Sequence, residues 1–249
     1  MRAAEYLGDL GGLSAHRKLI RLDMRGTGDS ATPADPSSYR CDRLVDDVEA
    51  LRGHLRLAHI DLLGHSAGAN LAELYAARHP GRVRRLALIT PSVAAVGVTV
   101  STTVRLDTAA LRRTEPWFPA AFAALHALIA GDTTAAVDEA VTPFFHGRWD
   151  APAQARRATD QMQRNDEAAA AFRADGAFDP PATRAALARF PSPVLVLAGE
   201  FDVNSPPPAM AEMAGLFPHA ELVVQPGAGH YPWVDDPDRF AATAATFLR

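Results

Sequence analysis

One short turn constrains this chain more than any other feature. Gly64-His65-Ser66-Ala67-Gly68 stands between an apolar run at 59–63, typical of a buried strand, and a helical pattern at 69–79. A strand that enters a helix through a Gly-x-Ser-x-Gly turn holds the serine on a strained bend, with its hydroxyl above the sheet. The pattern therefore predicts an α/β sheet and makes Ser66 a candidate nucleophile.

The rest of the chain alternates in the same way. Further strands are predicted at 18–23, 83–89, 193–198 and 221–224. Further helices are predicted at 42–57, 209–217 and 237–248. Such alternation is typical of a mostly parallel sheet flanked by helices. Because helical patterns alone fill the region after the strand at 83–89, we expect a core formed by 1–90 and 191–249, with a helical cap, or lid, inserted over 91–190.

Two polar residues follow the last predicted strands. Asp202 comes after 193–198 and His230 after 221–224, and the carboxyl ends of parallel strands meet at one edge of a sheet. A serine hydroxyl needs a base to take its proton and a third group to orient that base. We therefore predict Ser66 as nucleophile, His230 as general base and Asp202 as its partner, with the Ala67 amide as an oxyanion-hole donor at the helix start.

Nearby residues compete for some of these roles. Glu200 is an alternative to Asp202, but it lies two residues nearer the strand end. His65 belongs to the turn itself, which favours packing and hydrogen bonding over a role as base. Asp235 and Asp236 precede a helix and are interpreted as a charge pair at its N-terminus.

Composition narrows the remaining classes. With 25 Lys and Arg against 29 Asp and Glu, and neither sign gathered in a block, no nucleic-acid partner is expected. A single cysteine, Cys41, excludes an internal disulfide, and no metal-ligand or nucleotide-binding motif is found, so no cofactor and no metal are expected. No run reaches the ~18 apolar residues of a membrane span, and no signal peptide pattern opens the chain. We expect a cytoplasmic protein with a small-molecule substrate and leave the oligomeric state open.

Two further motifs identify a family. Residues 23–30, Asp-Met-Arg-Gly-Thr-Gly-Asp-Ser, are similar to the D-x-R-G-x-G-x-S turn of capped α/β-hydrolases, and 227–230, Gly-Ala-Gly-His, to their G-x-G-H. With the serine turn, the chain resembles the branch of the α/β-hydrolase superfamily that holds esterases, lactonases and proline-iminopeptidase-like enzymes. The resemblance implies a serine hydrolase that cleaves a small ester, lactone or amide through an acyl-enzyme. Ala67 stands where proline iminopeptidases usually carry tryptophan, which makes an aminopeptidase the lesser alternative.

The first residues depart from the family. The resemblance implies a His-Gly loop that donates a second oxyanion N–H, yet only 22 residues precede Asp23, and Gly11-Gly12 lacks a strand before it. We therefore expect the family's first three strands to be absent, the sheet to be open and Met1 to be an internal start. This leaves open whether the chain as written is active, and the alternative function is a non-catalytic or impaired binding protein of the same fold.

The substrate is not fixed by these motifs. Ser66 disfavours a haloalkane dehalogenase or epoxide hydrolase, which need a carboxylate nucleophile at the turn, whereas esterase, lactonase and peptidase share one machinery. Aromatic residues of the insertion are candidates to line an acyl pocket, although packing within the insertion is the simpler use. These residues are Trp117, Phe118, Phe144, Phe145 and Trp149.

Overall fold

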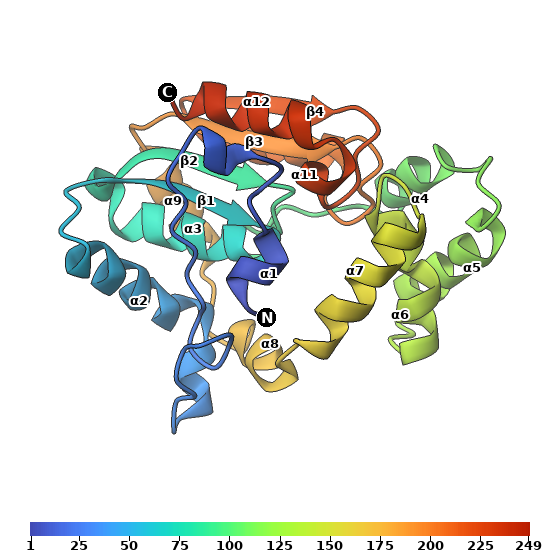
Figure 1. Cartoon of the computed structure of the whole chain (residues 1–249), viewed down its shortest axis with the longest axis horizontal. Coiled ribbons are helices and arrows are strands. Elements are labelled where there is room, and N and C mark those ends of the chain that lie inside the picture. The colour runs from blue at the N-terminus through green and yellow to red at the C-terminus, as the bar shows by residue number, and fades with distance from the viewer.

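Four parallel strands form the centre of the molecule, in the order β1-β2-β3-β4 (Figure 1). The computed structural model describes residues 1–249. The strands are β1 (Ile60–His65), β2 (Val83–Ile89), β3 (Val194–Gly199) and β4 (Ala220–Gln225). The prediction for 83–89 is confirmed at both ends, and the other three strands lie within two residues of their predicted bounds. All four carboxyl ends therefore meet at one edge of the sheet.

Helices cover both faces of the sheet because its strands are apolar on both sides. Leu86 and Leu88 of β2 belong to a core cluster with α2 (Cys41–His54), α3 (Ala67–Arg78) and α10 (Pro207–Ala214). Ala87 and Ile89, which point to the opposite face, pack in a second cluster with α11 (Pro232–Asp235) and α12 (Pro237–Phe247). Strands buried on both faces are near-continuous apolar runs, and this explains the pattern of β3, in which all six residues are buried.

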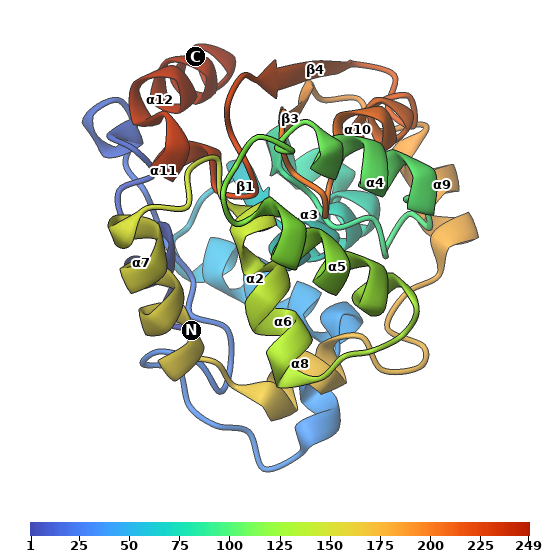
Figure 2. The same cartoon turned by 90° about the vertical axis from the view of Figure 1, so that its right-hand side faces the viewer.

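The region between β2 and β3 is helical. It contains α4 (Thr102–Ala110), α5 (Phe118–Ile129), α6 (Ala135–Val141), α7 (Ala151–Met162), α8 (Asp166–Phe172) and α9 (Pro180–Leu187). Helices α4 to α7 lie beyond the carboxyl ends of the strands, and Figure 2 views the molecule from their side. Part of this region has a small core of its own around Leu125 and Phe144. Leu187 and Phe190, by contrast, are buried in the main core, and α9 packs against α3.

The predicted strand at 18–23 is wrong. The chain there is extended but pairs with no strand, and it follows α1 (Ala3–Leu7) and a short 3-10 turn, Leu13–Ala15. Leu19 and Leu22 line the same cavity of about 820 Å³ as Leu62 of β1, whose strand forms one edge of the sheet. An apolar extended segment becomes a strand only where a second backbone shares its hydrogen bonds, and a cavity occupies that place here.

Three further 3-10 turns connect the elements, at Pro36–Tyr39, Pro80–Arg82 and Thr142–Phe145. None of the helices combines the length and the hydropathy that crossing a membrane requires.

Candidate active site

Ser66 occupies a strained position between β1 and α3. Its backbone has φ 51° and ψ −122°, a region that costs a non-glycine residue about 1–3 kcal/mol. The turn is fixed by its neighbours, because the Ser66 amide donates to Ile89 O at 3.1 Å and its carbonyl accepts from the Ser92 amide at 3.0 Å. The Ser66 side chain is thereby held at the carboxyl edge of the sheet.

Of the two glycines of this turn, one is required by space. A Cβ on Gly64 would lie 2.7 Å from Gly68 O and 2.8 Å from the Cα of Ala69, so only glycine lets the helix cross the strand end here. A Cβ on Gly68 would meet nothing within 4 Å.

Three side chains predicted from separate parts of the sequence form one chain of hydrogen bonds. His230 Nε2 lies 2.8 Å from Ser66 Oγ, and His230 Nδ1 lies 2.7 Å from Asp202 Oδ2. Asp202 is fully buried and His230 is 5% exposed. The second carboxylate oxygen of Asp202 accepts from the amides of Asn204 at 2.8 Å and Ser205 at 3.1 Å. The Asp202 carboxylate is thus held on both oxygens, with one of them facing the imidazole.

The loops that carry Asp202 and His230 interlock. The Phe201 amide donates to Ala228 O at 2.8 Å, next to Gly199 and Gly229. Glu200, the alternative to Asp202, turns away from His230, because its carboxylate accepts from the Gly227 amide at 2.7 Å.

Asp235 has a role that the sequence did not indicate. Asp236 alone caps α12, accepting from the Arg239 amide at 3.1 Å. Asp235 instead accepts from the amides of Gly147 at 3.0 Å and Gly229 at 2.8 Å, and burial raises the pKa of its carboxyl group. It ties the loop of His230 to the helical region, a long-range contact that no local pattern encodes.

The start of α3 offers a donor beside Ser66. Ala67 is the first residue of this twelve-residue helix, so its amide has no carbonyl acceptor within the helix. The helix dipole also places partial positive charge there, which favours an oxyanion.

His65 is not placed as a base. Its Nε2 lies 2.8 Å from the His230 carbonyl oxygen and its Nδ1 lies 2.9 Å from the Tyr6 hydroxyl, so both ring nitrogens are engaged away from Ser66. The expectation of a packing and hydrogen-bonding residue is confirmed.

The aromatic residues of the helical region pack among themselves. Trp117 and Phe118 meet Phe144 edge to face, with ring centroids 5.1 and 5.9 Å apart, and Trp149 lies against His146. The Phe145 carbonyl accepts from the His230 amide at 2.8 Å. None of the five predicted candidates lines the 820 Å³ cavity that reaches Ser66, although the Phe145 ring lies 6.1 Å from the ring of His230.

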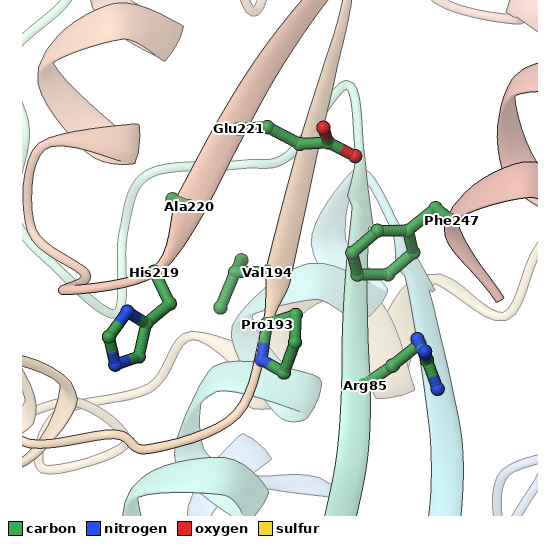
Figure 3. A pocket seen from close by; sticks show the side chains of 7 residues that line it. All are labelled: Arg85, Pro193, Val194, His219, Ala220, Glu221 and Phe247. Carbon is green, nitrogen blue, oxygen red and sulfur yellow. The ribbon is translucent and has the colours of Figure 1, made fainter. Parts of the chain in front are cut away.

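Two cavities differ in their relation to Ser66. The 820 Å³ cavity reaches Ser66 and Ala67. Polar residues of α7 and of the link between α7 and α8 also line it: Arg157, Asp160, Gln161, Arg164 and Asn165. A cavity of about 330 Å³ lies between Arg85, Glu221 and Phe247 (Figure 3). Val194 and Ala220, which also line it, are the first residues of β3 and β4, so it lies at the opposite edge of the sheet.

No three or more His, Cys, Asp or Glu side chains gather in an arrangement that could hold a metal ion. Cys41 is a buried free thiol.

Known proteins resemble this chain along nearly all of its length. The profile of the alpha/beta hydrolase fold family matches residues 5–237. A 2-hydroxymuconate semialdehyde hydrolase of Pseudomonas sp. (strain CF600) is 31% identical over 246 residues, which cover 95% of this chain and 78% of that protein. The solved structure of a thermophilic esterase from Thermogutta terrifontis has a TM-score of 0.68 at 25% identity, and the match covers 100% of this chain and 86% of the esterase chain. The solved structure of the enol-lactonase from Burkholderia xenovorans LB400 has a TM-score of 0.66 at 26% identity, and the match covers 99% of this chain and 86% of the lactonase chain. This chain, with its parallel sheet and its serine turn, is a member of the α/β-hydrolase family.

Proposed function

We propose that the protein is a serine hydrolase that cleaves a small-molecule ester, lactone or amide through an acyl-enzyme. The observation that carries the proposal is the continuous hydrogen-bonded series from Ser66 Oγ through the His230 imidazole to the Asp202 carboxylate. A hydroxyl alone is a poor nucleophile, and this series supplies both the base and the group that orients it.

The reaction proceeds in two halves. His230 Nε2 takes the Ser66 proton as Oγ attacks the carbonyl carbon, and the Ala67 amide donates to the oxyanion that forms. Asp202 stabilises the resulting imidazolium, which then gives its proton to the leaving oxygen or nitrogen. Water, deprotonated by His230, attacks the acyl-enzyme and releases the acid, with Ser66 restored.

An ester or lactone is favoured over a peptide. The support is Ala67, which stands where the resemblance to proline iminopeptidases implies a tryptophan. We further propose that α4 to α8 act as the cap over Ser66, whereas α9, which packs on α3, belongs to the core.

A second candidate substrate is 2-hydroxymuconate semialdehyde. Two curated hydrolases of that name match 95% and 94% of this chain. Arg157 and Arg164 line the cavity at Ser66, and guanidinium groups suit the carboxylate of such a substrate. Both arginines also form ion pairs with protein carboxylates, Arg157 with Asp138 and Arg164 with Asp166. Because these pairs already neutralise the two guanidinium groups, we rank a simple ester above this substrate.

The test is chemical labelling followed by turnover. The intact mass of the protein is measured after treatment with a fluorophosphonate, and the adduct is located by peptide mapping. Initial rates are then compared on 4-nitrophenyl acetate, a γ-lactone, proline 4-nitroanilide and 2-hydroxymuconate semialdehyde. We expect one adduct at Ser66 and turnover that Ser66→Ala abolishes. A folded protein that takes no label and hydrolyses none of these compounds would instead be the non-catalytic binding protein of this fold.

A further inference from the structure

We infer that Tyr6 and His65 are positioning residues: together they hold the backbone of His230 at the distance from Ser66 that proton transfer needs. The inference rests on the proposed function, since it concerns how that catalytic pair is kept aligned. It adds two residues whose hydrogen bonds to each other and to the His230 carbonyl do not involve the Ser66 hydroxyl.

The hydrogen bonds fix the tautomer of His65. Its Nε2 lies 2.8 Å from the His230 carbonyl oxygen, which can only accept, so Nε2 carries the ring proton. Nδ1 is then an acceptor, and the Tyr6 hydroxyl, 2.9 Å away, donates to it. Tyr6 therefore orients the His65 ring so that its single N–H points at the main chain of His230.

Burial disfavours the charged form of both side chains. His65 is 7% exposed and Tyr6 is half-buried, and burial lowers the pKa of His65 and raises that of Tyr6. His65 also lies close to His230, with ring centroids 4.9 Å apart, where a second cation would oppose the imidazolium of the catalytic step. A neutral His65 that donates one hydrogen bond positions His230 without competing for its charge.

The His230 peptide is held from both sides. Its amide donates to Phe145 O at 2.8 Å, from the helical region, and its carbonyl accepts from His65 and from Thr90 Oγ1 at 3.0 Å. His65 directly precedes Ser66, so this bond joins the end of β1 to a residue 165 positions away in the chain. The 2.8 Å separation of Ser66 Oγ and His230 Nε2 depends on that junction.

Tyr6 is itself clamped by α7. The guanidinium of Arg156 lies over the rings of Tyr6, Tyr231 and Trp233, at 5.6, 5.1 and 5.8 Å from their centroids, and it donates to the Tyr6 carbonyl. A series of contacts thus runs from Arg156 of α7 through Tyr6 and His65 to His230, the residue that would act as base.

Four variants separate positioning from structural support. His65→Leu removes both hydrogen bonds, whereas His65→Gln keeps an amide N–H for the His230 carbonyl and an oxygen for Tyr6. Tyr6→Phe removes only the hydroxyl that fixes the tautomer. Tyr75→Phe is the control, because it also removes a tyrosine hydroxyl that donates a hydrogen bond. The Tyr75 hydroxyl donates to Glu49 at 2.7 Å, and neither residue contacts the His65 ring.

The readouts are kcat and KM on 4-nitrophenyl acetate, together with the melting temperature of each variant. Loss of one buried hydrogen-bond partner at the base should lower kcat about 10- to 100-fold in His65→Leu and about 10-fold in Tyr6→Phe, with KM within about 2-fold. His65→Gln should recover most of kcat, and Tyr75→Phe should keep it despite a lower melting temperature. A His65→Leu enzyme with wild-type kcat, or a His65→Gln enzyme as slow as His65→Leu, would overturn the inference.

A measurement that needs no turnover keeps the two proposals apart. The proton of the His230 Nδ1–H···Asp202 hydrogen bond is followed by NMR as a downfield resonance. We expect it in the wild type and in His65→Gln, and we expect it broadened or lost in His65→Leu. Its persistence unchanged in His65→Leu would refute the positioning role, whereas a wild type that shows it but neither takes the fluorophosphonate nor cleaves the ester would refute the proposed function alone.

Discussion

Gly199 and Gly229 pass each other so closely that a Cβ on Gly199 would overlap the Gly229 carbonyl and lie 2.7 Å from Ala228 O. The obstacle is backbone on both sides, so no side chain can rotate away. This crossing places the loop of Asp202 against the loop of His230, and their hydrogen bond of 2.7 Å depends on it.

Gly199→Ala should therefore separate the two loops. We expect an unfolding free energy lower by about 1–3 kcal/mol and slower fluorophosphonate labelling of Ser66 in the folded protein. Urea denaturation and the labelling rate measure the two effects. Gly53→Ala in α2, where a Cβ meets nothing within 4 Å, is the control and should leave labelling unchanged. Wild-type labelling in Gly199→Ala would show that the crossing does not set the site.

Glu73 should make the stability fall as pH rises. It is fully buried in α3, neither of its carboxylate oxygens has a hydrogen-bond partner, and burial raises its pKa well above the ordinary value. Between the lower pKa of Glu73 in the unfolded state and its higher pKa in the folded state, only the folded protein keeps the proton on Glu73. Over this range the unfolding free energy falls by up to about 1.4 kcal/mol per pH unit as pH rises.

Glu73→Gln removes this titration. The unfolding free energy of the wild type relative to Glu73→Gln should fall between pH 5 and pH 8, as measured by urea denaturation at both values. Glu49→Gln serves as the control, since Arg52 and Tyr75 lower the pKa of Glu49 to about 2 and place its effect below this window. A difference between wild type and Glu73→Gln that is constant over this range would mean that Glu73 does not titrate there.

The sequence predicted best those features that a local pattern encodes. The bounds of β2 follow from an apolar run closed by turn residues, and Ser66, Asp202 and His230 each lie in the loop or turn that follows a predicted strand. Residues 18–23 also carry a short apolar run, yet they form no strand and none of them is buried, because an apolar run does not show whether a partner strand lies beside it. The roles of Tyr6 and Asp235 could not be predicted for a related reason: their partners His65 and Gly147 are distant in the sequence, and Asp235 is interpreted from the sequence only as part of a charge pair at a helix start.

Asp235→Asn should lower kcat while the protein stays folded. Each carboxylate oxygen accepts from one glycine amide, so an asparagine necessarily turns a donor toward Gly147 or Gly229. We expect a cost of about 1–3 kcal/mol, expressed as a lower kcat on 4-nitrophenyl acetate, because the Gly229 loop carries His230. Asp236→Asn is the matched control, since asparagine caps a helix as well as aspartate does. Equal kcat values for the two variants would mean that the hydrogen bonds of Asp235 to Gly147 and Gly229 do not position His230.

Ser66→Gly should be more stable than Ser66→Ala although both lack the nucleophile. Alanine keeps the strain of φ 51°, whereas glycine adopts that conformation freely. Relief of about 1–3 kcal/mol of strain, less about 0.5–1 kcal/mol for the greater freedom of unfolded glycine, leaves Ser66→Gly ahead by about 1 kcal/mol. At Ser38, within the 3-10 turn Pro36–Tyr39, the same pair of substitutions should rank in the opposite order. Urea denaturation of the four variants measures both differences, and a less stable Ser66→Gly would mean that the backbone of this turn stores no strain.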